Sequence, residues 1–68
     1  MTDEQIKAMN EGEFLAWSNT LPRPPFAIQR SLREIRRVGW QHPAWGNQLM
    51  AVYRDESGSL YKQAMAPF

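Results

Sequence analysis

The first 20 residues carry their apolar side chains at helical spacing. At 100° per residue, one arc of about 160° collects Ile6, Met9, Phe14, Ala16 and Trp17. A stripe of this width is typical of a helix that packs one side against a core. The pattern therefore predicts a helix over residues 3–19.

The opening "TDEQ" predicts where this helix begins. Thr2 can accept a hydrogen bond from the backbone N–H of Gln5, while the Gln5 side chain reaches back to Thr2, which is a capping box. Gly12 lies in the middle of the pattern, where glycine costs a helix about 1 kcal/mol relative to alanine. The first helix is either continuous or broken at Gly12, and the sequence leaves both open.

A second helical pattern follows a proline-rich linker over residues 20–25. Pro24 and Pro25 favour the start of a helix, because proline presets the backbone of the first turn. Ile28, Leu32 and Ile35 then recur at i, i+4 and i+7. The expected second element is a helix over residues 25–38, with Gly39 as its C-terminal cap.

The last third of the chain alternates in a different way. Two runs rich in Leu, Val, Tyr and Met flank the turn Asp55–Gly58, which predicts a β-hairpin over residues 48–66. With Arg54 opposite Ser59, its buried face would hold Leu49, Ala51, Tyr53, Leu60 and Ala64. The stretch 39–47, "GWQHPAWGN", is expected to be an aromatic loop with a turn at Gly46 and Asn47.

These elements predict one small domain over residues 1–68 with an α+β fold. Two N-terminal helices come first, the first of them either continuous or broken at Gly12, and a C-terminal β-hairpin packs on them. A chain of 68 residues hides only about 60% of the surface that its unfolded form exposes. A homodimer that shares the core is therefore an alternative to a monomer.

Charge is unevenly distributed along the chain, although the net charge is only +1. Residues 1–22 hold one lysine and four carboxylates, whereas residues 23–37 hold five arginines and one glutamate. On the expected second helix the arginines form one stripe of about 120°, made of Arg30, Arg33, Arg36 and Arg37. They either face solvent, pair with the acidic first segment, or bind a partner.

Aromatic residues follow this basic segment directly. Arginine and tryptophan are both enriched at the energetic centres of protein interfaces. Core capping competes with binding as the role of the two tryptophans, and His42 is expected to be a half-exposed loop residue. The predicted partner-binding residues are Arg30, Arg33, Arg36, Arg37, Trp40, His42 and Trp45.

Catalytic motifs are missing from the sequence. There is no cysteine and only one histidine, too few ligands for a zinc site. No G-x-S-x-G elbow, glycine-rich phosphate loop or dinucleotide fingerprint occurs. We expect no enzymatic activity and no cofactor, and we interpret the carboxylates of Asp55 and Glu56 as turn residues.

Two functional hypotheses remain. The favoured one is a small protein-binding module, such as a bacterial or phage accessory or inhibitory factor, which docks its arginines and tryptophans on an acidic face of a larger partner. The alternative is a nucleic-acid-binding protein that lays the basic helix on phosphates and uses the hairpin as a wing. The acidic N-terminus and the lack of a long apolar run favour a soluble cytoplasmic protein without a membrane segment.

Overall fold

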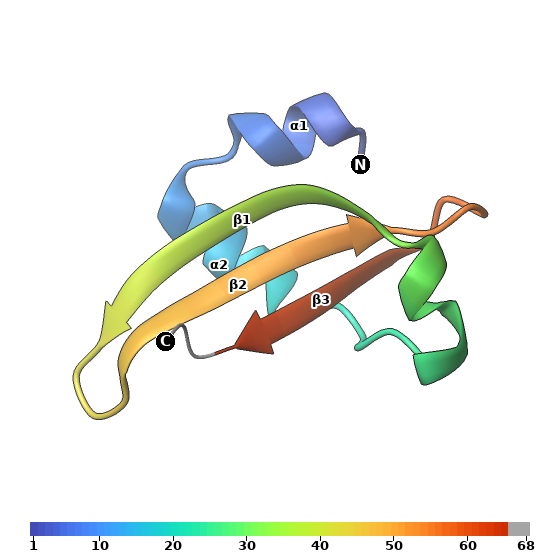
Figure 1. The fold of residues 1–68 in the computed structure, drawn as a ribbon. Helices are drawn as coiled ribbons and strands as arrows, with labels where there is room; N and C mark the ends of the chain where they lie inside the picture. The colour runs from blue at the N-terminus through green and yellow to red at the C-terminus, as the bar shows by residue number, and fades with distance from the viewer. Residues whose placement is uncertain (66–68) are drawn as a thin grey trace.

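The computed structural model describes residues 1–65, which adopt an α+β fold of short helices followed by a three-stranded antiparallel sheet (Figure 1). The strand order is β1-β2-β3, so each strand pairs with its neighbour in sequence. The elements are α1 (Asp3–Ala8), α2 (Glu11–Ser18), the 3₁₀ helix η1 (Phe26–Ser31), β1 (Arg33–His42), β2 (Gly46–Arg54) and β3 (Leu60–Met65).

The N-terminal helical region is split into two helices. The capping box at Thr2 and Gln5 is confirmed, with both reciprocal hydrogen bonds present at the start of α1. A continuous helix over 3–19 is wrong, and the break lies at Met9 and Asn10 rather than at Gly12. Asn10 causes a new start, because its side chain accepts from the Glu13 N–H at 2.8 Å and so caps α2.

The predicted basic helix over residues 25–38 is wrong. Only Phe26–Ser31 is helical, as a 3₁₀ helix, and the chain enters β1 at Arg33. Ile35 has no partner in the pairing of β1 with β2, because the register shifts between Glu34 and Arg36. Ile35 and Val38 are both buried although they lie three positions apart, because the β-bulge at Ile35 interrupts the alternation of the strand. Such spacing resembles a helical period more than the alternation of a strand.

The predicted aromatic loop over residues 39–47 is also wrong for most of its length. β1 continues to His42 and β2 begins at Gly46, so only Pro43, Ala44 and Trp45 form the turn. Gly46 adopts a φ of +73°, which is the left-handed conformation that closes this turn. The strands β1 and β2 therefore form a long hairpin, and its turn lies at the end of the sheet opposite η1 (Figure 1).

The C-terminal hairpin is confirmed as β2 and β3, but its predicted register is wrong by one residue. Arg54 pairs with Leu60 rather than Ser59, and Tyr53 pairs with Tyr61. Asp55 sets this register, because its N–H donates to the Ser59 carbonyl at 3.0 Å and its carboxylate accepts from the N–H groups of Ser57 and Ser59. The predicted end of the hairpin, residue 66, lies outside the described residues.

The core lies between the helices and one face of the sheet. Strand pairing places Val38 and Trp40 of β1 on the same face as Met50 and Val52 of β2. The buried apolar cluster combines this face with α1 and α2, and it comprises Ile6, Phe14, Ile35, Val38, Met50 and Val52. The predicted packing face is wrong for β2, because Leu49, Ala51 and Tyr53 alternate with Met50 and Val52 and so lie on the opposite face of the sheet. Leu60 of the same predicted face pairs with Arg54 and packs against the core cluster.

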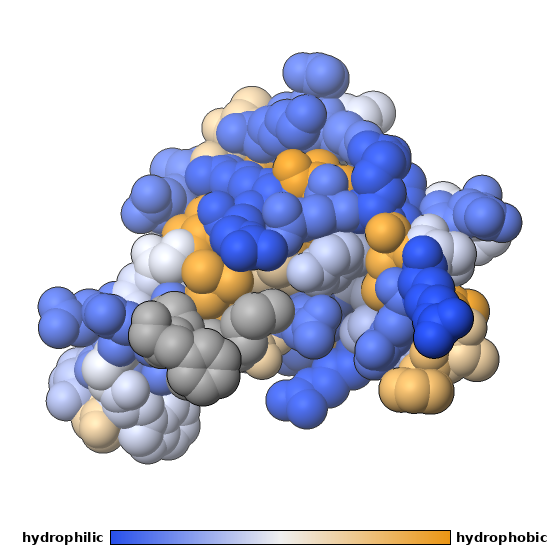
Figure 2. Space-filling model, in the orientation of Figure 1, coloured by the Kyte–Doolittle hydropathy of each residue, from blue (hydrophilic) through white to orange (hydrophobic). Residues whose placement is uncertain are grey.

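A surface view of the molecule shows apolar patches separated by polar side chains (Figure 2). Through residues 1–65, no helix combines the length and the apolar character that crossing a membrane requires.

Candidate functional site

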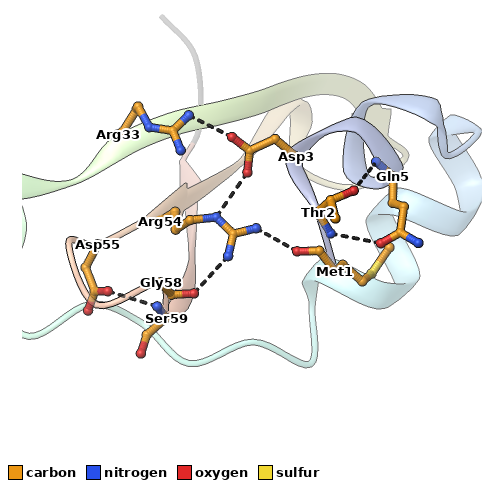
Figure 3. Close-up of polar contacts among 9 residues, drawn as sticks. All are labelled: Met1, Thr2, Asp3, Gln5, Arg33, Arg54, Asp55, Gly58 and Ser59. Atoms are coloured by element: carbon orange, nitrogen blue, oxygen red, sulfur yellow. Dashed lines mark hydrogen bonds and ion pairs between the residues drawn. The ribbon is translucent and has the colours of Figure 1, made fainter.

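Two of the six arginines bind the same carboxylate on α1. Asp3 Oδ2 lies 2.8 Å from Arg33 NH1, and Asp3 Oδ1 lies 3.0 Å from Arg54 Nε (Figure 3). Arg54 also donates to the carbonyls of Met1 and Gly58. The hydrogen bond from Arg33, with a further contribution from Arg54, lowers the pKa of the Asp3 carboxyl despite some desolvation. Asp3 thus joins the first turn of α1 to β1 and β2.

Arg36 lies on the helix-covered face of the sheet. Its NH1 donates to the carbonyls of Ile6 and Met9 at 2.9 and 2.6 Å, and its guanidinium lies 4.7 Å from the centre of the Phe14 ring. These carbonyls belong to the C-terminal end of α1, where the helix leaves acceptors without an intrahelical donor. Arg36 therefore caps α1 from the sheet.

The other two predicted arginines lie apart from each other. Arg37 is on the open face of the sheet and bonds Glu34 at 2.8 Å, which raises its pKa. Arg30 is exposed on η1, beside a shallow hollow that it lines with Phe26, Ala27 and Gln29. The predicted single stripe of Arg30, Arg33, Arg36 and Arg37 is wrong, because it needed the helix that β1 replaces.

The three predicted aromatic residues, by contrast, lie on one hairpin. We define the hairpin arm as residues 39–49, which comprise the end of β1, the turn and the start of β2. Trp40 is half-buried and packs against the core cluster, so core capping accounts for most of this residue. Trp45 at the turn is 74% exposed.

The turn at the tip of the hairpin arm is organised around His42. Its Nδ1 accepts hydrogen bonds from the backbone N–H groups of Ala44 at 3.0 Å and Trp45 at 3.2 Å. The imidazole also stacks on the Trp45 indole, with ring centres 4.2 Å apart and an interplanar angle of 10°. Gln48 Nε2 donates to the Trp45 carbonyl at 3.1 Å. The exposed indole is consequently held in a defined orientation.

An open groove lies where the hairpin arm meets α2. It has a volume of about 350 Å³, and its walls are Leu15, Ala16, Asn19, Trp40 and Met50. Trp40 and His42 lie on the same face of β1, because they are two residues apart and the pairing with Gln48 and Gly46 is regular there. The groove and the arm together offer apolar surface and amide groups.

The hairpin arm lacks charged residues. Residues 39–49 contain no Asp, Glu, Lys or Arg, and His42 is their one titratable side chain. The arm is therefore suited to stacking, apolar contact and amide hydrogen bonds rather than to ion pairing.

Several residues of this region were not identified from the sequence. Leu15, Ala16, Asn19, Met50 and Gln48 reach it only through the packing of α2 on the sheet and the pairing of β1 with β2. No local pattern signals that juxtaposition. The link from Asp3 to Arg54 also depends on tertiary structure, because the two residues lie 51 positions apart.

Within residues 1–65, no group of three His, Cys, Asp or Glu side chains could hold a metal ion. No family model, curated protein or solved structure matches the chain.

Proposed function

We propose that this protein is a binding module that docks on another protein through its hairpin arm and the adjoining groove. The observation that carries the proposal is the Trp45 side chain, 74% exposed yet stacked on His42 at the tip of a long hairpin. Large exposed aromatic residues on a defined scaffold are typical centres of binding energy.

Preorganisation supports this assignment. A free indole loses side-chain entropy when a partner fixes it, which weakens binding. Here the stack on His42 and the two hydrogen bonds to its Nδ1 already order the turn before any partner arrives. More of the contact energy of Trp45 is then available for affinity.

The charge distribution favours a protein over a nucleic acid. Affinity for nucleic acid comes largely from cations placed on phosphates, and the hairpin arm has no lysine or arginine. Arg33, Arg36 and Arg54 already bind groups within the chain. The acidic-partner hypothesis stays a prediction for Arg30 and Arg37, which are exposed on other faces.

The test compares capture by matched variants. Immobilised wild type, Trp45→Ala and Phe26→Ala are incubated with bacterial lysate, and captured proteins are purified and titrated against each variant. Phe26 is the matched control, because it is an exposed aromatic residue (89%) on η1, away from the arm. We expect a partner whose affinity falls at least about tenfold with Trp45→Ala and is unchanged by Phe26→Ala.

The opposite ranking of the two variants would reject the arm as the docking surface. Binding to random-sequence DNA at about 50 mM salt, lost on Arg30→Glu, would replace the proposal with the nucleic-acid alternative. Light scattering on the wild type identifies a second copy of this chain as the occupant if the mass doubles.

A further inference from the structure

The structure assigns His42 a second role as a proton-sensitive latch on the tip of the hairpin arm: neutral His42 holds Trp45 in place, and protonated His42 releases the turn. The latch is a property of the free protein. Its consequence for partner binding rests on the function proposed above.

The hydrogen bonds at His42 identify its neutral form. Nδ1 accepts from two backbone N–H groups, at 3.0 Å from Ala44 and 3.2 Å from Trp45. A nitrogen that accepts carries no hydrogen, so the ring proton is on Nε2. Of the three residues that follow His42, Pro43 has no N–H, and this one acceptor binds the N–H groups of the other two.

Protonation removes that acceptor. The added proton binds at Nδ1, and both ring nitrogens of the imidazolium are then donors. The N–H groups of Ala44 and Trp45 would face an N–H of the cation, so the ring has to turn away and both hydrogen bonds are lost. Because the same ring stacks on the indole of Trp45, its movement also removes the stack.

No charged residue of the neighbouring elements β1, β2 and α2 faces His42. Along β1 the nearest charged residue is Arg37, which is on the opposite face and bonds Glu34. β2 carries no charge before Arg54. From α2, the part that reaches the arm is Leu15, Ala16 and the adjacent Asn19, whereas Glu11 and Glu13 are in the first turn. Within residues 39–49, His42 is the one titratable side chain, and histidine is the residue type that serves as a charge switch in the range of physiological pH.

His42→Asn provides a matched control. An asparagine carbonyl oxygen at this position can accept from the following backbone N–H groups, as it does in Asx turns. It keeps the acceptor but does not titrate. His42→Asn is therefore expected to hold the turn at every pH, without the aromatic stack.

The first measurement is an NMR titration of the free protein from pH 8 to pH 5. We expect the amide resonances of Ala44 and Trp45 to move with the same midpoint as the His42 ring protons. Their protection factors should fall about tenfold below that midpoint, the size expected from losing hydrogen bonds of ordinary strength. In His42→Asn these amides should stay constant. If the His42 ring titrates while both amides keep their shifts and protection, the latch is rejected.

The second measurement repeats the capture titration at pH 7.5 and pH 5.5. We expect the wild type to lose affinity at pH 5.5 and His42→Asn to keep the affinity it has at pH 7.5. A pH-dependent turn in the NMR titration, together with binding that ignores Trp45, would leave the latch standing and reject the proposed docking. If the amides of Ala44 and Trp45 do not change with pH but binding depends on Trp45, the latch is rejected and the proposed docking stands.

Discussion

Besides the apolar core, single polar side chains join the helices of this protein to its sheet. Arg36 does so from β1, by donating to two carbonyls of α1 and lying over the ring of Phe14. Asp3 does so from α1, between Arg33 and Arg54 (Figure 3). A small core makes such polar links a large share of the total stability.

Arg36→Ala is expected to lower the free energy of unfolding by about 2–3 kcal/mol, because it removes charged hydrogen bonds and a cation–π contact. Urea denaturation measures the change. Arg37→Ala is the matched control, since Arg37 is the next residue but lies on the open face, and it should have a much smaller effect. Equal losses in the two variants would show that Arg36 does not act through α1.

Asp3 gives the protein an acid-sensitive contact. Its pKa is lowered in the folded state, so the charged carboxylate stabilises the fold above the unfolded value of about 3.9. That contribution is lost as the pH falls further, through the folded pKa. The stability difference between wild type and Asp3→Asn should therefore shrink between pH 5 and pH 2.5 in urea titrations.

Glu4→Gln is the control for the acid titration, because Glu4 forms no ion pair within residues 1–65. Its difference from wild type should change little over the same pH range. An Asp3→Asn difference that stays constant from pH 5 to pH 2.5 would contradict the ion-pair assignment.

At the scale of elements, glycines have opposite roles in helices and turns. Gly58 has a φ of +93° in the β2–β3 turn, whereas a Cβ on Gly12 in α2 would meet only Asn10 Oδ1, at 3.6 Å. Gly58→Ala should cost about 1–2 kcal/mol, and Gly12→Ala should gain about 0.5–1 kcal/mol. Thermal unfolding measures the stability change in each variant. A loss of stability in Gly12→Ala would contradict the conclusion that α2 has room for a methyl group at this position.

The elements that the sequence predicted correctly are the ones with local signals. The capping box at Thr2 uses residues three apart, and the β2–β3 turn uses the residues from Asp55 to Ser59. β1 could not be predicted in this way. Its bulge at Ile35 breaks the alternation, and its inward Arg36 finds acceptors 27 and 30 residues away. A charged residue facing a core has no local explanation.

In the candidate site, too, the features with local sequence signals were predicted and those that depend on tertiary contacts were not. Trp40, His42 and Trp45 were identified from their residue types, and β1–β2 pairing brings them onto one hairpin. The arginines were grouped by a helical period that does not exist in β1, so they separated onto different faces. The groove beside α2 was missed, because its walls come from segments that meet only in the folded chain.

In the whole molecule, the ion pairs of Asp3 and the hairpin arm lie at opposite ends of β1 and β2. The ion pairs of Asp3 lie where α1 meets the start of β1 and the end of β2, while the uncharged hairpin arm is at the other end of those strands (Figure 1). We propose that the polar links stabilise the fold while the hairpin arm contacts a partner protein.

Site-specific photocrosslinking tests whether a partner protein docks on the hairpin arm. A photoreactive phenylalanine analogue replaces Ala44, an exposed residue next to Trp45, and in a second variant it replaces Ala27, an exposed residue next to Phe26. Both positions leave the two large aromatic residues intact. We predict an adduct with one partner protein from position 44 and none from position 27. An adduct from position 27 alone, with the complex still forming, would contradict docking through the hairpin arm.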